Sequence, residues 1–296
     1  MNVDFSIVLL TYKRDDILDK QFTNLVKVIE YYHGNVEVIL VDNNADFIDR
    51  AKYISPLNTV CKHQIIQPSQ NLGVSGGRNV GFENARGDYV LFIDDDAILQ
   101  NIAILAILEK EFLDEKVGIV AGKSFNPIEN KFPIEELPHS KKSQSLEKKW
   151  KTFRFIGVVH CIRSEVIRDF RYDESFFYGM EEMDLSFYSI QLGWEIIFVP
   201  DLYVHHFKHP SGRIHGNEYW FRVFTNKIKV VRKYYPFYYG IPVTLLWFAF
   251  ILFKSKRPFK LISILAKVFL RSSEPKMILN SKAISYIKSV NGSLLR

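Results

Sequence analysis

Three consecutive aspartates, Asp94, Asp95 and Asp96, follow the apolar run Tyr89–Ile93. This run predicts a buried strand of a parallel sheet, and carboxylates at the carboxyl end of such a strand lie where open α/β sheets bind ligands. Three adjacent negative charges repel one another, so a cation must compensate them. A hard divalent ion, Mg²⁺ or Mn²⁺, held partly by substrate phosphates, suits these oxygen ligands. The alternative is a solvated acidic turn or a helix N-cap.

Two further features have the chemistry to bind a nucleotide. The glycine-rich segment 71–81 precedes a predicted helix, so its backbone N–H groups can approach a phosphate, and Arg78 can contact a diphosphate in a bidentate way. Asp42 ends a predicted strand beside Thr11, where it can accept a base N–H or bind a ribose hydroxyl. The alternatives are a plain glycine-rich turn and an Asx-turn.

An acidic segment near residue 180 is the candidate source of a general base. Glu181, Glu182 and Asp184 begin a predicted helix, where the helix dipole favours negative charge. Glu182 and Asp184 cannot face the same direction, so they should have different tasks. A carboxylate in a partly closed cleft can remove a proton from an acceptor hydroxyl. An acidic helix start without function is the alternative.

Four histidines at positions 205, 206, 209 and 215 lie in a predicted loop after Pro200. A neutral imidazole of His205 or His206 can complete an oxygen-rich metal site. The alternative is that both are structural or solvated.

Alternating strands and helices predict an α/β fold with a doubly wound, mostly parallel sheet. The predicted strands are Ser6–Thr11, Glu37–Val41, His63–Gln67, Tyr89–Ile93, Val117–Ala121, Arg154–Cys161 and Glu195–Val199. The predicted helices are Asp15–Tyr32, Ser75–Ala85, Ile98–Leu113, Glu181–Leu192 and Gly216–Arg232. Residues 123–150 are expected to form a long mobile loop that closes over a ligand.

The C-terminal part differs sharply in charge from the rest of the 296 residues. Residues 1–221 carry 24 Lys and Arg against 32 Asp and Glu, whereas residues 222–296 carry 15 against one. A basic tail on an acidic body indicates a polyanionic partner, either anionic lipid or nucleic acid.

Composition favours lipid as that partner. Residues 234–253 are uncharged and long enough to cross a bilayer of about 30 Å, but prolines and a glycine interrupt them. Residues 260–271 predict a basic amphipathic helix. We therefore expect residues 232–271 to form an interfacial or monotopic anchor on an anionic membrane, in preference to a full span, a buried helix or a nucleic-acid surface. Two cysteines and no visible secretory signal predict a reducing, cytoplasmic setting.

Taken in order, these residues resemble the family 2 glycosyltransferases of the GT-A fold. The matching stretches are SIVLLTYKR (6–14), EVILVDNN (37–44), NLGVSGGRNVGFENARGDYVLFIDDD (71–96), DESFFYGMEEMDLSFYSIQLGWEIIFVP (173–200) and the histidine-bearing segment at 205. Their layout is most similar to the rhamnosyltransferase-type branch that builds bacterial surface polysaccharides.

The resemblance implies roles for the donor-binding residues. Thr11 and Asp42 would hold the nucleotide base and ribose, and Arg78 would help with the nucleoside diphosphate. Asp94 would lie near the ribose, with Asp95 beside the donor but mainly structural.

The resemblance also implies a metal site and a base. Asp96 and Asp94 would bind Mn²⁺ or Mg²⁺ with His205 as the third protein ligand. Glu182 stands where the family usually has Asp, which makes it the expected catalytic base, with Glu181 and Asp184 as alternates.

The implied reaction is the inverting transfer of one sugar from a UDP- or dTDP-sugar to a glycan or lipid-linked saccharide, at the cytoplasmic face of a bacterial membrane. A single transfer is expected because the Gln-x-x-Arg-Trp motif of processive synthases is absent. The expected domains are a catalytic part, residues 1–215 (divided near 122 and 123), and a membrane-binding tail, 216–296. The alternatives are a sugar-1-phosphate nucleotidyltransferase and a non-catalytic, membrane-tethered nucleotide-sugar-binding protein.

Overall fold

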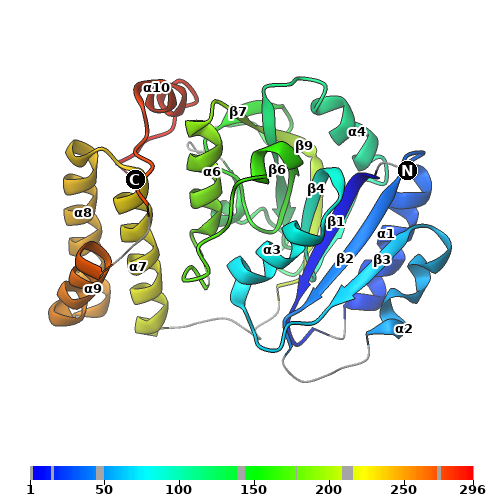
Figure 1. Cartoon of the computed structure of the whole chain (residues 1–296), viewed down its shortest axis with the longest axis horizontal. Coiled ribbons are helices and arrows are strands. Elements are labelled where there is room, and N and C mark those ends of the chain that lie inside the picture. Colours follow the sequence, from blue (N-terminus) through cyan, green and yellow to red (C-terminus); the bar gives the residue numbers. More distant parts are fainter. Residues whose placement is uncertain are drawn as a thin grey trace.

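A computed structural model shows a nine-stranded sheet flanked by helices, with a helical C-terminal part at one end of the molecule (Figure 1). The strand order is β3-β2-β1-β4-β8-β6-β9-β5, and β7 pairs with β9. The structure describes residues 3–14, 17–44, 50–138, 144–177, 179–208, 216–271 and 275–295.

The first half of the sheet is parallel, as predicted. It consists of β1 (Val3–Thr11), β2 (Val36–Asp42), β3 (Lys62–Ile66) and β4 (Gly87–Asp94). In this register Thr11 pairs with Asp42, and Leu10 pairs with Asp94. The polar residues that end these three strands therefore meet at one edge of the sheet.

The second half is mixed. β8 (Val159–Arg163) runs antiparallel to both β4 and β6 (Val117–Phe125), while β9 (Glu195–His206) runs parallel to β6. Two short strands, β5 (Ala97–Leu99) and β7 (Trp150–Thr152), pair with β9 in antiparallel fashion.

The structure corrects the predicted end of β9. Pro200 was expected to end this strand, but the strand continues to His206. The β6–β9 pairing shifts register between Ala121 and Lys123, where their partners are Phe198 and Tyr203. Pro200 lies in that irregularity, which accommodates a residue without a backbone N–H. His205 and His206 are consequently strand residues and not loop residues.

Three further predictions require correction. The strand expected over Arg154–Cys161 begins only at Val159 and continues to Arg163. The helix expected over Ile98–Leu113 is replaced by β5 followed by α4 (Ile104–Glu111), because residues 97–99 pair with the extended β9. The long loop expected over 123–150 is shorter: it begins after β6, contains the 3₁₀ turn η2 (Ile134–Glu136) and ends at β7. Residues 139–143 of that predicted loop lie outside the described residues.

Side chains alternate between the two faces of the sheet, and each face packs in its own hydrophobic core. From β1, Phe5, Ile7 and Leu9 pack in one core while Val8 packs in the other, as the two-residue period of a strand requires. The first core includes α1 (Leu18–Tyr31) and α4, and the second includes α3 (Gly73–Asn84) and α6 (Glu181–Gln191). The remaining short helices are α2 (Ala51–Ile54), η1 (Ser55–Thr59) and α5 (Ser164–Ile167).

The C-terminal part consists of α7 (Gly216–Tyr234), α8 (Phe237–Ser255), α9 (Pro258–Arg271) and α10 (Ser281–Ser289). Helix α7 packs against both α8 and α9 around a small core that includes Phe224, Ile251 and Leu261. Its other face joins the core of the second half of the sheet through Val230 and Tyr234. In length and composition α8 could cross a membrane, and little of it is buried.

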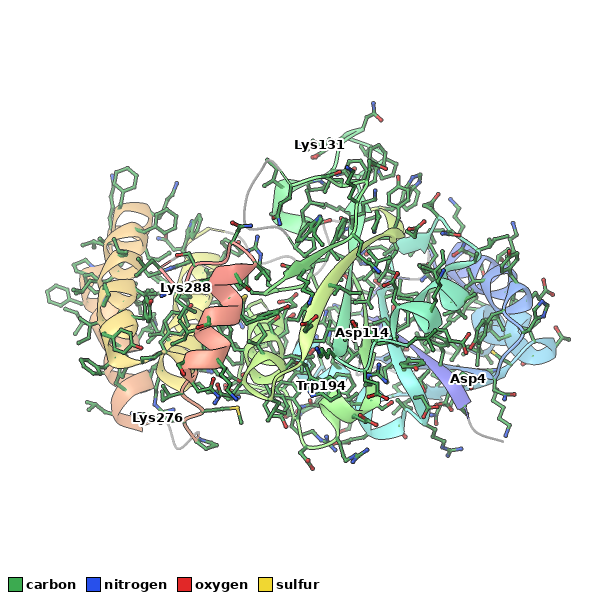
Figure 2. The ribbon with its side chains drawn as sticks, turned by 90° about the horizontal axis from the view of Figure 1, so that it is seen from above. Asp4, Asp114, Lys131, Trp194, Lys276 and Lys288 are labelled. Carbon is green, nitrogen blue, oxygen red and sulfur yellow. The ribbon has the colours of Figure 1, made fainter. Side chains whose placement is uncertain are left out.

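Helix α10 was not predicted, and it returns to the sheet (Figure 1). Figure 2 shows Lys288 of this helix, with Lys276 at the same end of the molecule and Asp4 of β1 at the other. The Ile196 N–H of β9 donates to Tyr286 Oη at 3.0 Å, and Tyr286 Oη donates to the Thr152 carbonyl of β7 at 2.9 Å. The tyrosine therefore fastens α10 to the β7–β9 pair.

Replacing Tyr286 with Phe should lower the free energy of unfolding by about 1–3 kcal/mol, because the mutation removes both hydrogen bonds at a partly buried site. Denaturant unfolding measures the change. The matched control is Tyr31→Phe at an exposed position of α1, which should change stability by less than about 0.5 kcal/mol. Equal effects of the two substitutions would show that α10 is not held by this contact.

Candidate active site

The edge formed by β1 and β2 holds two of the predicted donor-binding residues. Asp42 is buried, and its Oδ2 accepts from Arg50 Nε at 3.0 Å while its Oδ1 accepts from the Asn44 N–H at 3.1 Å. Burial raises the pKa of Asp42, and the hydrogen bonds from Asn44 oppose that rise. Within the described part of the chain, the buried Thr11 hydroxyl has no hydrogen-bond partner. The hydroxyl lies near Asp95 and lowers the pKa of that carboxyl, so its bonding capacity can be directed to Asp95 or to a ligand.

A cluster of metal-ligand type lies at the end of β4. Ligand atoms of Asp94, Asp96 and His206 all lie within 4.8 Å of one another. His206 Nε2 is 3.1 Å from Asp96 Oδ1, and Arg14 Nη1 pairs with the other Asp96 oxygen. His206 Nδ1 is 2.9 Å from Glu136 Oε2. Two carboxylates and one imidazole are a donor set that a divalent cation can use.

The charges in this cluster shift each other's protonation. Burial would raise the pKa of Asp96, but His206 and Arg14 outweigh it and lower that pKa to about 2. Burial would lower the pKa of His206, but Asp96 and Glu136 raise it to about 10. In these contacts His206 is an imidazolium between two carboxylates.

The structure brings His206, and not the expected His205, to the aspartates. Consecutive strand residues face opposite sides, and His205 points to Tyr203, with Nε2 2.9 Å from the Tyr203 hydroxyl oxygen. The pairing of β5 with β9 sets this register, because Ala97 lies opposite His206 and the Phe207 N–H donates to the Asp96 carbonyl at 2.8 Å. His209 and His215 lie outside the described residues.

Asp95 is buried, like Asp96, whereas Asp94 is partly exposed. Asp95 is 6% exposed, and its Oδ2 has no hydrogen-bond partner among the described residues. Burial and the nearby Asp96 charge raise the pKa of Asp95 to about 7. Its contact with a donor stays a prediction.

Arg78 connects the aspartates to the acidic helix. Its Nη1 is 3.0 Å from Glu181 Oε1, and its Nη2 donates to the Gly157 carbonyl at 3.2 Å. Burial and the neighbouring Glu182 raise the pKa of Glu181 to about 8, against the opposing effect of Arg78. The predicted contact of Arg78 with a diphosphate is not tested by these contacts, which hold the guanidinium inside the protein.

The three acids that begin α6 have different surroundings. Asp184 is fully buried and accepts from Lys233 Nζ at 2.7 Å and from Tyr234 Oη at 2.6 Å, so it fastens α7. Glu181 is the buried partner of Arg78. Glu182 is only partly buried, which leaves it the most accessible of the three.

A glycine makes room for this arrangement. A Cβ added at Gly157 would lie 2.4 Å from Glu182 Oε1 and 2.6 Å from Arg78 Nη2, so a larger residue would push both side chains away. Gly157, Arg14 and Glu136 were not predicted as site residues. Only Arg14 carries a signal in the sequence, since it follows β1 by three positions in the same segment as Thr11.

The ion pairs of His206 predict a pH-dependent stability in excess chelator. Because its pKa is raised from 6.5 to about 10, the stabilisation is complete below pH 6.5 and disappears as the pH rises through 10. His206→Gln should therefore cost about 3 kcal/mol near pH 6, where Asp96 and Glu136 are ionised, and the cost should shrink towards pH 10.

Denaturant unfolding across this pH range measures the difference. The control, His33→Gln at an exposed position, should change stability by less than about 0.5 kcal/mol throughout. A cost for His206→Gln that is constant with pH would contradict the charge assignment.

Comparisons with known proteins agree with this geometry. The model of the family "Glycosyl transferase family 2" matches residues 6–171. The amylovoran biosynthesis glycosyltransferase AmsB of Erwinia amylovora is 24% identical over 212 residues, which cover 67% of each chain.

Two solved structures resemble the whole chain in fold. TarS 1-349 of S. aureus in complex with UDP-GlcNAc has a TM-score of 0.59 at 16% identity, covering 90% of this chain and 71% of that one. The mannosyltransferase PcManGT from Pyrobaculum calidifontis, in complex with GDP-Man and Mn²⁺, has a TM-score of 0.58 at 15% identity, covering 98% and 79%. With its family model matched over more than half of the sequence, the chain belongs to glycosyl transferase family 2 and has the GT-A fold.

Proposed function

We propose that this glycosyltransferase moves a single sugar, with inversion, from a nucleoside-diphosphate sugar to a hydroxyl of a glycan or lipid-linked saccharide. The observation that carries the proposal is the cluster of Asp94, Asp96 and His206 at the strand ends, joined through Arg78 to the acids of α6. This arrangement supports a diphosphate-binding centre and a base on two sides of one site.

The donor set fits a divalent cation, Mn²⁺ or Mg²⁺. Asp94, Asp96 and His206 would hold it and leave positions for phosphate oxygens and water. Arg14 and His206 both contact the Asp96 carboxylate, so an ion held there would compete with Arg14, and His206 would bind it as the neutral imidazole. When bound, such an ion supplies Lewis-acid stabilisation of the diphosphate leaving group.

The donor nucleotide would lie along the ends of β1 and β2. Thr11 offers its hydroxyl, which also lies near Asp95, and Asp42, fixed by Arg50 and Asn44, offers a carboxylate edge to the base or ribose. The nucleotide sugars in the neighbouring structures, UDP-GlcNAc and GDP-Man, support a nucleoside diphosphate. A UDP- or dTDP-sugar is our preferred donor.

Glu182 is the proposed catalytic base. Asp184 is committed to α7 and Glu181 to Arg78, so neither carboxylate can approach an acceptor without breaking a buried ion pair. Glu182 can accept the proton of the acceptor hydroxyl while that oxygen attacks the anomeric carbon from the side opposite the diphosphate. Such in-line attack inverts the configuration of the sugar.

We further propose that the enzyme works at the cytoplasmic face of a bacterial membrane in the synthesis of a surface polysaccharide. The exposed apolar side chains of α8 and α9, together with the lysines of these helices, support an interfacial anchor on anionic lipid. The name of AmsB, an amylovoran biosynthesis glycosyltransferase, supports the polysaccharide assignment. The catalytic part would be residues 1–215, and 216–296 would hold it at the membrane.

Replacing Glu182 with Gln should lower the turnover number by about 10²–10⁴-fold, because the amide cannot take the acceptor proton. Donor affinity should stay within about twofold, since Glu182 does not belong to the donor-binding edge. Nucleotide release from UDP-, dTDP- and GDP-sugars, with and without saccharide acceptors, measures turnover, and thermal shift measures donor binding.

Glu165→Gln, at an exposed position of α5, provides the matched control and should keep full turnover. A Glu182→Gln enzyme that retains most of its activity would remove Glu182 as the base. Wild-type protein that releases no nucleotide from any of these donors would contradict the proposed function itself.

A further inference from the structure

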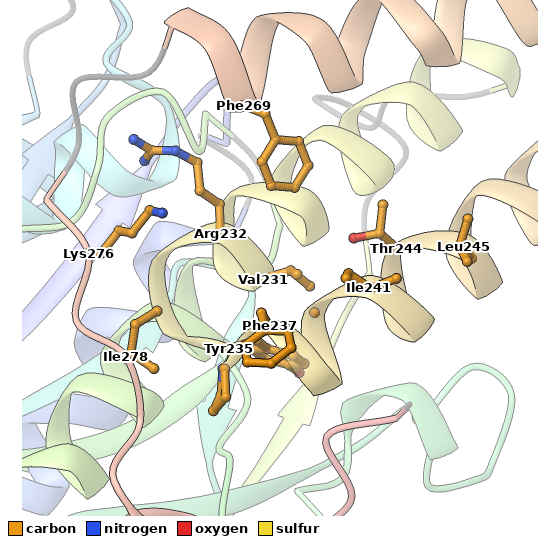
Figure 3. A pocket seen from close by; sticks show the side chains of 12 residues that line it. Val231, Arg232, Tyr235, Phe237, Ile241, Thr244, Leu245, Phe269, Lys276 and Ile278 are labelled. Carbon is orange, nitrogen blue, oxygen red and sulfur yellow. The ribbon is translucent and has the colours of Figure 1, made fainter.

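A cavity of about 650 Å³ lies between the C-terminal helices (Figure 3), and none of the candidate active-site residues lines it. Much of its wall is formed by Val231 of α7, Tyr235 in the α7–α8 connection, Ile241 and Leu245 of α8 and Phe269 of α9. This volume is in the range of pockets that bind small molecules, and the wall is mainly apolar. The occupant must therefore offer a hydrocarbon surface.

The cavity has a cationic side. Arg232 at the end of α7 and Lys276 in the segment before α10 both line it, and Figure 3 shows them together on one side of it. No acidic residue is among the described residues that line the cavity. A negatively charged group at one end of the occupant would be attracted by these two cations.

The cavity opens onto an exposed apolar surface of α8. Three of its lining residues on α8 are themselves largely exposed: Phe237 at 77%, Ile241 at 60% and Leu245 at 63%. A ligand with a hydrocarbon chain would reach this entrance from a bilayer more readily than from water. The charge and the apolar surface together describe an amphiphile that is already in the membrane.

Inside the cavity, one polar group lacks a partner. The Thr244 hydroxyl oxygen is inaccessible to solvent and has no hydrogen-bond partner among the described residues. Figure 3 shows the Thr244 side chain among the residues that surround the cavity. This hydroxyl can donate to an ester carbonyl that lies between a charged head and a hydrocarbon chain.

We propose that this cavity binds one anionic phospholipid, with an acyl chain between α7, α8 and α9, an ester near Thr244 and the phosphate at Arg232 and Lys276. The inference rests on the membrane association included in the proposed function. It goes beyond a general attraction to anionic surfaces, because it assigns a single lipid to a defined site.

Gly240 provides the test of the cavity. A Cβ at this position would lie 3.4 Å from Val231 Cγ1 and 3.8 Å from Tyr235 Cβ, so alanine fits without displacing either residue. A leucine would extend further and fill part of the cavity. Gly240→Leu and Gly240→Ala are therefore a matched pair, and Thr244→Leu is a second filling variant should Gly240→Leu fail to fold.

Native mass spectrometry of the full chain in an uncharged detergent, titrated with phosphatidylglycerol or phosphatidylcholine, counts and ranks the bound lipids. Wild-type protein should bind one phosphatidylglycerol more tightly than phosphatidylcholine. Gly240→Leu should weaken phosphatidylglycerol binding by about tenfold, the loss expected when roughly two methylene groups are no longer buried, while Gly240→Ala stays within about twofold.

A second pair of variants tests the two cations that line the cavity. Arg232→Gln with Lys276→Gln should reduce the preference for phosphatidylglycerol by about tenfold, whereas Lys282→Gln with Lys288→Gln, exposed on α10, should preserve it. Lys276→Gln alone, which should lose part of the preference, serves if the double variant does not fold. Equal lipid binding by wild type and by the filling variants would overturn the proposal, as would a dimer in place of the lipid adduct.

Sedimentation with vesicles of phosphatidylcholine, with or without phosphatidylglycerol, separates this inference from the proposed function. Gly240→Leu should still sediment, because the exposed face of α8 is unchanged. Wild-type protein that binds no vesicle would contradict the membrane association, whereas vesicle binding without a specific lipid adduct would contradict only the cavity assignment.

Discussion

Mutual repulsion among buried carboxylates is the constraint on which this structure depends. Asp94, Asp95 and Asp96 are consecutive, and the acids that begin α6 lie across the site from them. Such a concentration of negative charge is unstable away from water unless cations balance it. Arg14, Arg78 and His206 supply that balance, and each comes from a different part of the chain.

This charge balance depends on the extension of β9 in the second half of the sheet, which brings His206 to the aspartates. The register shift near Pro200 lets β9 continue to His206, and β5, which starts immediately after Asp96, pairs with that extension. A buried carboxylate also joins the tail to the catalytic part. Asp184 of α6 forms an ion pair with Lys233 of α7 and accepts a hydrogen bond from the Tyr234 hydroxyl of the same helix. The C-terminal helices are thus fixed to the helix that carries the proposed base.

The parts of the fold that could be predicted are those in which local pattern and tertiary environment agree. The apolar runs of β1, β2 and β4 end in polar residues, so both the strands and their ligand edge follow from the sequence. Their order along the chain also identified Asp94 and Asp96. Helix α7 agrees with the helix expected over Gly216–Arg232. The expected interruption of residues 234–253 is wrong, because α8 runs unbroken from Phe237 to Ser255 with Pro242 inside it.

The predictions that failed concern features that depend on contacts with residues distant in the sequence. Pro200 is a strong local signal for the end of a strand, and only the bulge against β6 cancels it. Without a strand beyond Pro200 the alternation of side chains could not be applied, so His205 and His206 could not be told apart. Glu136 has no signal in the sequence, because its contact with His206 arises only when η2 folds over β9. Helix α10 did carry one, since Asn280 caps it by accepting from the Ala283 N–H at 2.9 Å.

Electron spin-echo spectroscopy of protein-bound Mn²⁺ tests the central claim most directly, because it detects nitrogen nuclei coordinated to the ion. The account predicts a histidine nitrogen signal that is present in wild type and in His205→Gln and is lost in His206→Gln. A signal that survives in His206→Gln and disappears in His205→Gln, or wild-type protein that binds no Mn²⁺ in the presence of a nucleoside diphosphate, would contradict it.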